Sequence, residues 1–235
     1  MEHAANSTGD LNARLDAKDS KNGVQEFPIS ANPAAGEGTW CFHPDNSIDI
    51  AVLPVNMQSL NEHGFEPGWF ASDQTAADTS KLKELEVAAG DGAFVLGFPM
   101  NLTGEQHNYV IVRQGAIARI SEMLDGASKV FMLDALVFPG NSGGPVVLKP
   151  DAISIQGTKN QSVAYLIGLV LSYLPYTDMA ISVQTKHPRI TFEENSGLAE
   201  VLPVDYVDQT IAACRWAQQR QETKGANDSK SPPKK

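Results

Sequence analysis

The sequence has 235 residues, of which 42% are hydrophobic and 20% are charged, which is typical of a globular protein and excludes a low-complexity chain. The formal net charge is −10 at pH 7, and so acidic a chain repels phosphate backbones, which argues against nucleic acid as a partner. No stretch has the length of apolar sequence that spans a bilayer, so we expect no membrane segment. The 19 glycines and 14 prolines are spread along the chain and favour an all-β protein with many short elements.

The first predicted elements are two strands joined by a turn. Leu11–Asp16 alternates apolar and polar residues, a polar bend with Asn22-Gly23 follows, and Val24–Ile29 forms the second strand. Ile48–Val55 is a compact β-branched run, which favours a buried strand. Further strands are expected over residues 93–97, 109–112, 116–120, 130–133, 145–148 and 164–171.

The end of the chain predicts one helix and a tail. Apolar residues recur there at spacings of three and four, which is typical of one helix face: Val204, Val207, Ile211 and Cys214. Residues 222–235 have almost nothing to bury and are expected to be disordered.

The cysteine content excludes a disulfide framework. Cys41 and Cys214 are the two cysteines, and they could form one bridge. Cys214 falls on the apolar side of the expected helix, which favours a buried thiol. No Cys/His cluster has the spacing of zinc ligands, and we expect no metal or other cofactor.

The segment Gly140-Asn-Ser-Gly-Gly144 carries the strongest chemical signal. A nucleophilic serine needs an exposed hydroxyl and backbone N–H groups that converge on the developing oxyanion, and flanking glycines allow the tight turn and the close approach of substrate. A glycine-rich turn that merely contains a serine is the alternative, and Pro139 before the segment with Pro145-Val-Val after it favours the nucleophile. The nucleophile elbow of α/β-hydrolases requires a helix directly after the serine, which Gly143–Val147 does not favour.

The run Phe138–Val147 resembles the Gly-Asn-Ser-Gly-Gly-Pro signature of trypsin-like serine proteases, in particular bacterial trypsin-like peptidases and high-temperature-requirement proteases. Further segments follow in the family's order. Asp49–Leu53 resembles the strand of the triad aspartate, and Gly90–Pro99 resembles a Gly-Asp…Gly-Phe-Pro run of the first barrel. Arg113–Ala118 resembles the entry to the second barrel, Leu133–Ala135 the strand before the nucleophile, and Ile167–Ser172 the strand along which substrate lies. The resemblance implies two antiparallel β-barrels of the chymotrypsin type with a C-terminal helix. We expect the N-terminal barrel over residues 1–112, the second barrel with the helix over 113–221, and the tail over 222–235.

By this resemblance Ser142 is the nucleophile, Asp49 the triad acid and His3 the base, in the order His, Asp, Ser. A strand aspartate that caps a turn is the alternative role for Asp49. His43 lies only six residues before Asp49, too close for the hairpin that the family places between base and acid, whereas His3 is well spaced. The backbone N–H groups of Gly140 and Ser142 are expected to form the oxyanion hole. Asn141 replaces the aspartate that pairs with a newly cut N-terminus in pancreatic-type proteases, so activation by such cleavage is not expected.

The resemblance also places four residues near the pocket for the side chain before the cut: Leu136, Phe138, Val170 and Ser172. Residues 136–138 and 170–173 contain no acid, which favours a small or medium apolar side chain over Lys or Arg. The expected function is a serine endopeptidase that acts on polypeptides through an acyl-enzyme. The alternative is a protease-like module, catalytically weak or inactive, that binds a partner peptide.

The family places two strands of the first barrel before its histidine, but this sequence reaches His3 at once. We therefore expect an incomplete first barrel, a poorly held His3 and weak activity of this chain. The first ten residues lack the basic start and apolar core of a signal peptide, which leaves a cytoplasmic location as the default.

Overall fold

The computed structural model describes residues 11–19, 23–29, 40–65, 67–151 and 157–215. The chain divides into two compact units. The first unit combines residues 1–67 with residues 205–235, and the second covers residues 68–204. Each unit has its own strands and is described in turn.

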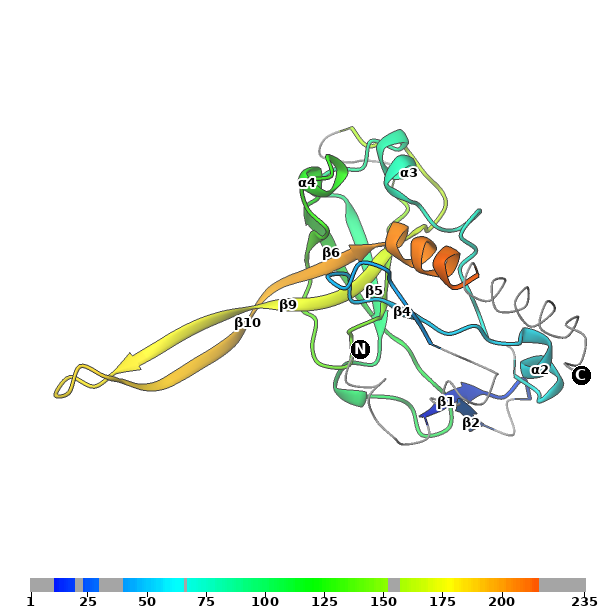
Figure 1. Ribbon diagram of the computed structural model, residues 1–235, viewed down its shortest axis with the longest axis horizontal. Coiled ribbons are helices and arrows are strands. Elements are labelled where there is room, and N and C mark those ends of the chain that lie inside the picture. Colours follow the sequence, from blue (N-terminus) through cyan, green and yellow to red (C-terminus); the bar gives the residue numbers. More distant parts are fainter. Residues whose placement is uncertain (1–10, 20–22, 30–39, 66, 152–156, 216–235) are drawn as a thin grey trace, which may run out of the picture. The chain divides into compact units, whose positions relative to one another are not determined.

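The second unit is a closed barrel of six antiparallel strands in the order β10-β7-β6-β5-β8-β9 (Figure 1). Its strands are β5 (Gly92–Gly97), β6 (Ile111–Arg119), β7 (Phe131–Asp134), β8 (Pro145–Leu148), β9 (Leu166–Ile181) and β10 (Pro188–Pro203). Burial alternates along β5, because every second side chain points into the barrel. The interior is filled by branched and aromatic side chains that include Val95, Ile117, Phe131, Leu133, Leu148 and Ile167.

Three short helices lie in the loops of the barrel: α3 (Thr79–Glu84), the 3₁₀ helix η2 (Pro99–Asn101) and α4 (Ser121–Leu124). The Asp78 side chain accepts a hydrogen bond of 2.7 Å from the backbone N–H of Lys81, which caps the start of α3. Leu82 of α3 and Met123 of α4 are buried and belong to the core of the barrel. The helices therefore extend the apolar core between strands.

The structure corrects the expected assignment of Gly90–Pro99 to the first barrel. This segment forms β5, which pairs with β6 on one side and with β8 on the other. The expected boundary at residue 112 falls inside β6, whereas the two units meet in sequence at Pro67 and Gly68. The sequence pattern predicts that β5 is a strand but carries no information about its distant partners.

Three further strands differ from the sequence prediction. β6 joins the segments expected as separate strands at 109–112 and 116–120. β9 continues ten residues beyond the predicted end at residue 171, although it contains Pro175, which has no N–H to donate to a neighbouring strand. Its partner β10 was not predicted, because Asn195-Ser-Gly197 has the composition of a turn.

The first unit contains two separate two-stranded sheets within its described residues. β1 (Leu11–Asp16) pairs with β2 (Val24–Ile29) as predicted. β3 (Cys41–Phe42) pairs with β4 (Ala51–Val52), which is all that forms of the strand expected over Ile48–Val55. α2 (Met57–Glu62) follows, with the Asn56 side chain as its N-terminal cap.

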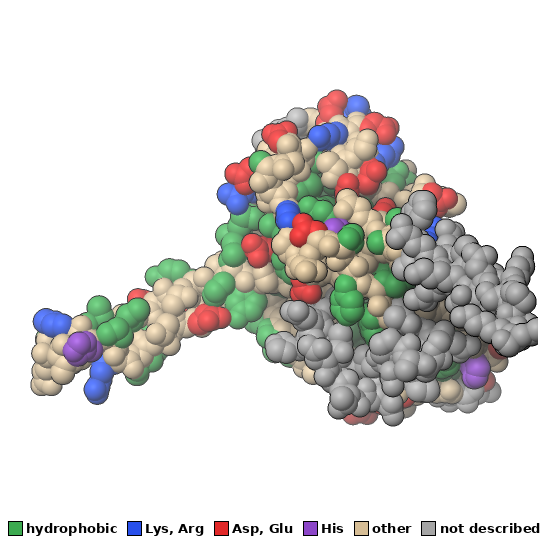
Figure 2. Space-filling view, viewed as in Figure 1, with side chains coloured by type: hydrophobic (Ala, Val, Ile, Leu, Met, Phe, Trp, Pro, Cys, Tyr) green, Lys and Arg blue, Asp and Glu red, His purple; other side chains and the backbone are tan. Residues whose placement is uncertain are grey.

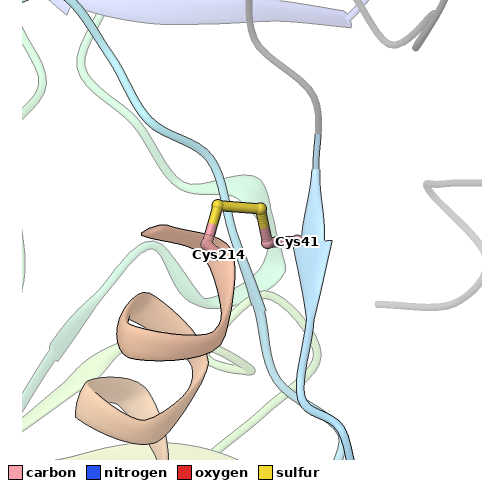
Figure 3. Close-up of a disulfide and its surroundings, with 2 residues drawn as sticks. All are labelled: Cys41 and Cys214. Atoms are coloured by element: carbon pink, nitrogen blue, oxygen red, sulfur yellow. A yellow bond between two sulfur atoms is a disulfide. The ribbon is translucent and has the colours of Figure 1, made fainter. Parts of the chain in front are cut away.

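The predicted C-terminal helix is present over residues 204–215, and the tail at 222–235 lies outside the described residues. One side of this helix contacts the loop around β3. Cys214 forms a disulfide with Cys41, with 5.5 Å between their Cα atoms (Figure 3). Cys214 is buried as predicted, but it is not a free thiol.

The closed six-stranded barrel and the C-terminal helix confirm the predicted all-β fold of the chymotrypsin type. No helix among the described residues is long and apolar enough to cross a membrane.

Candidate active site

Ser142 lies in the turn that leads into β8 of the barrel. Ser142 is exposed, whereas its neighbour Asn141 is only 1% exposed. The turn changes direction through Gly140 and Gly143, whose φ angles of 97° and 78° lie in the left-handed region. The two glycines therefore hold the serine out of the barrel while its neighbour points inward.

The Asn141 side chain fixes the shape of this turn. Its Oδ1 accepts a 3.0 Å hydrogen bond from the Phe138 backbone N–H, and its own backbone N–H donates to the Phe138 carbonyl at 2.9 Å. Its Nδ2 lies 2.8 Å from the position that a Cβ would occupy at Gly97 of β5. Glycine at position 97 is thus needed to make room for Asn141.

Backbone hydrogen bonds anchor the turn on both sides. The Gly143 N–H donates to the Val170 carbonyl at 2.8 Å, and the Val170 N–H donates to the Gly144 carbonyl at 2.9 Å. On the other side, the Met100 N–H donates to the Pro139 carbonyl at 2.6 Å. A Cβ at Gly140 would lie 2.6 Å from the Phe98 carbonyl oxygen, so this approach also requires glycine. The turn is held between β9 and the loop after β5.

Two backbone N–H groups of the turn remain available for a ligand. Among hydrogen bonds between described residues, none starts at the N–H of Gly140 or of Ser142. These are the two groups expected to form the oxyanion hole. An exposed hydroxyl beside two such donors has the components that acyl transfer requires.

The four expected substrate-binding residues lie in different environments. Leu136 is 51% exposed, and Phe138 is half-buried with its ring 5.1 Å from the Arg113 guanidinium. Val170 is only 3% exposed, and both of its backbone polar groups bond to the turn at Ser142. Val170 therefore supports the turn from within the barrel, and its contact with a substrate stays a prediction.

Ser172, the fourth of these residues, has an acidic neighbour that sequence reasoning missed. Its hydroxyl donates to the Glu200 carboxylate at 2.7 Å, because β10 pairs with β9 at these positions. Residues 136–138 and 170–173 contain no acid, yet the barrel supplies one from the next strand. No local pattern in the sequence indicates this pairing.

A second contribution of β10 supports the segment before Ser142. The Asn195 Nδ2 donates to the Val137 carbonyl at 2.5 Å, and its Oδ1 accepts from the Gly197 N–H at 2.9 Å. The Gly197 carbonyl in turn accepts from the Ala135 N–H at 2.9 Å. An irregularity in the pairing of β10 with β9 between Asn195 and Ala199 makes these contacts available.

The expected acid and base belong to the first unit. Asp49 is exposed between the buried residues Ile48 and Ile50, just before β4. His3 lies outside the described residues. Ser142 belongs to the second unit, so its association with Asp49 and His3 stays a prediction.

His43, the other histidine before Asp49, has a structural environment. It is 7% exposed, its Nε2 lies 3.1 Å from the Gln209 Oε1, and its Nδ1 accepts from the Asp45 N–H at 3.0 Å. Its ring packs edge-on against Tyr206 at 5.5 Å. Together with the disulfide, these contacts attach the C-terminal helix to the β3 loop.

Comparison with known proteins identifies a family whose match covers the turn at Ser142. The chain matches the family model described as a trypsin-like peptidase domain over residues 3–151, a range that includes His3, Asp49 and Ser142. A search of curated proteins found no significant match. The family match covers more than half of the chain, and its range contains the nucleophile turn together with β5 to β8 of the closed barrel. The chain therefore belongs to the family of trypsin-like peptidase domains.

Proposed function

We propose that this protease is a serine endopeptidase that cleaves polypeptides through an acyl-enzyme formed on Ser142. The observation that carries the proposal is the turn at residues 140–144, where an exposed serine follows a buried asparagine. The N–H groups of Gly140 and Ser142, which have no partner within the described residues, support it because they can donate hydrogen bonds to the negative charge that develops on a carbonyl oxygen.

In the proposed mechanism His3 takes the proton of the Ser142 hydroxyl as its oxygen attacks the scissile carbonyl. The tetrahedral oxyanion receives hydrogen bonds from the N–H groups of Gly140 and Ser142. His3 then gives the proton to the leaving amine, and a water molecule repeats the sequence to release the acid product. Asp49 holds the His3 ring in one tautomer and stabilises its charged form.

Substrate preference is a separate proposal. Exposed Leu136 and half-buried Phe138 support acceptance of a small or medium apolar side chain before the cut. Glu200 beside Ser172 adds a carboxylate near this region, which would tolerate a polar or basic group. Peptide libraries that vary this residue, compared between the native protein and Glu200→Gln, would resolve the two contributions.

Steady-state hydrolysis of an unfolded protein substrate tests the triad. Ser142→Ala should lower turnover on the order of 10⁴-fold or more, and His3→Ala and Asp49→Asn should each cause a large loss. His63→Ala changes an exposed histidine in the first unit and is the matched control for His3. Activity that survives Ser142→Ala would exclude the serine mechanism. Peptide binding by the native chain without turnover would instead favour the binding module.

A further inference from the structure

β9 and β10 extend beyond the barrel as a two-stranded ribbon, here called the arm and defined as residues 175–195 (Figure 1). Pairing in the arm runs from Pro175 opposite Asn195 to Ile181 opposite Pro188. Every residue of the arm from Tyr176 to Ile181 and from Pro188 to Glu194 is exposed. An isolated two-stranded ribbon is marginally stable in water, so the arm is expected to be covered by a partner.

The arm exposes large apolar side chains on both of its faces. Those on the face turned to the viewer are green in Figure 2. The exposed fractions are 59% for Tyr176, 48% for Met179, 58% for Ile181, 57% for Ile190 and 51% for Phe192. Scattered apolar residues are ordinary on a protein surface, but a group of them on one projecting element marks an interaction surface.

The edge of β10 in the arm is suited to accept another strand. Among the described residues, β10 pairs with β7 only from Leu198 to Val201, so the stretch Arg189–Asn195 has β9 on one side and an open edge on the other. This stretch contains no proline, so each residue retains its backbone N–H. β9 carries Pro175 in the corresponding part of the arm, which makes its edge less suitable. An open edge of this kind is a template for strand addition.

The edge sequence is complementary to itself. Arg189-Ile-Thr-Phe-Glu193 has threonine at its centre, an apolar residue on each side, and opposite charges at its two ends. We propose that a second copy of this chain pairs with β10 in antiparallel orientation, with a twofold axis at Thr191. The result is a dimer whose two arms form one four-stranded sheet.

The twofold at Thr191 makes the two cross-strand pairs on either side of the axis favourable. Ile190 of one copy lies opposite Phe192 of the other, which is a β-branched and aromatic pair on the same face of the sheet. Arg189 lies opposite Glu193 of the other copy, and these pairs occur twice because of the symmetry. Arg189 is the extra residue where the pairing with β9 shifts, and its long side chain can reach the carboxylate. A twofold moved by one residue to Phe192 would instead set Ile190 opposite Glu194 and lose both types of pair.

Charge reversal tests this register, with sedimentation velocity of the full chain as the readout. The native protein should dimerise in the micromolar range. Arg189→Glu and Glu193→Arg each place like charges opposite each other at both symmetric positions and should weaken dimerisation by about ten-fold or more. An equimolar mixture of the two variants should form a heterodimer, because all facing charges are then opposite. The double variant should dimerise like the native protein.

Two controls separate this effect from a damaged arm. Glu194→Arg makes the same charge change on the opposite face of β10 and should leave the dimer intact. Tyr173→Phe removes the 3.0 Å hydrogen bond that Tyr173 donates to Glu193 within one chain, and it should also leave the dimer intact. Recovery of association in the mixture shows that each single variant is folded.

A cross-link gives a second measurement. Paired Cα atoms of antiparallel strands lie about 4.5–5.5 Å apart, within the range of a disulfide, so Thr191→Cys should yield a covalent dimer on oxidation. Thr177→Cys on β9, opposite Glu193, should not. A monomeric native protein across the micromolar range, charge variants that dimerise as well as the native chain, or equal cross-linking at both positions would overturn the proposal.

Discussion

Removal of the Cys41–Cys214 disulfide should cause a large loss of stability. The bridge joins residues separated by 173 positions, so it closes a loop that contains the whole second unit. In the chain-entropy model a loop of this length corresponds to about 5 kcal/mol, and measured losses for native disulfides are about 2–5 kcal/mol. That range is comparable with the total stability of many domains, about 5–15 kcal/mol. The double variant Cys41→Ala/Cys214→Ala removes the bridge without leaving a free thiol or a buried hydroxyl.

Denaturant unfolding followed by circular dichroism measures this loss, with and without a reducing agent. We expect reduction to lower the unfolding midpoint of the native protein to near that of the double variant, and to leave the variant unchanged. Hydrogen exchange should show faster exchange in the helix at residues 204–215, because the covalent link is gone and the contacts of His43 with Gln209 and Tyr206 alone are weaker than the bridge. Two reactive thiols in the unfolded, unreduced native protein would refute the assignment of the bridge, and an unchanged midpoint on reduction would refute its energetic role.

The bridge also bears on where the protein works. Disulfides persist in oxidising compartments and are rare in the cytosol. A loss of about 2–5 kcal/mol on reduction would leave little stability in a reducing compartment. The bridge therefore predicts an oxidising compartment rather than the cytoplasm, and trapping of free thiols by alkylation in cells tests this prediction.

Three further changes have expected outcomes. Asn141→Ala removes the acceptor for the Phe138 N–H at a buried position and should cost about 1–3 kcal/mol of unfolding free energy, with loss of hydrolysis. Gly97→Ala places a Cβ 2.8 Å from the Asn141 Nδ2 and should lower kcat, measured by peptide hydrolysis, whereas Gly126→Ala at a surface turn has no such contact and should only strain the backbone locally. The Glu193 carboxylate raises the pKa of Tyr173 through their hydrogen bond, so Glu193→Gln should lower that pKa in a titration of phenolate absorbance. Because the pKa of Tyr173 is raised in the folded state, this bond stabilises the fold below pH ~10, the ordinary tyrosine value, and the contribution is lost as the pH rises through the folded-state pKa.

Local features of the sequence predicted local structure. The alternating runs on either side of Asn22-Gly23 gave the β1–β2 hairpin at its observed bounds, because the turn and the strands are adjacent. The glycines around Ser142 predicted the nucleophile turn for a similar reason, since the φ angles at Gly140 and Gly143 are requirements of the turn itself.

Features that depend on distant partners could not be predicted. β5 looked like part of the first barrel because its own residues say nothing of its pairing with β8. The Glu200 carboxylate beside Ser172 follows from the pairing of β10 with β9, and the Cys41–Cys214 bridge follows from the packing of the C-terminal helix on the β3 loop. Each of these contacts joins segments that are far apart in the sequence, so the residues of one segment do not indicate which other segment it contacts.

Labelling with a fluorophosphonate tests the central claim most directly, because this probe reacts with an activated serine and needs no knowledge of the natural substrate. The native chain should be labelled at Ser142, as located by mass spectrometry of the digested protein. Ser142→Ala should abolish labelling, and Ser80→Ala, which alters an exposed serine of α3, should retain it. Equal labelling of the native protein and Ser142→Ala, or labelling at another serine, would contradict the assignment of Ser142 as the nucleophile.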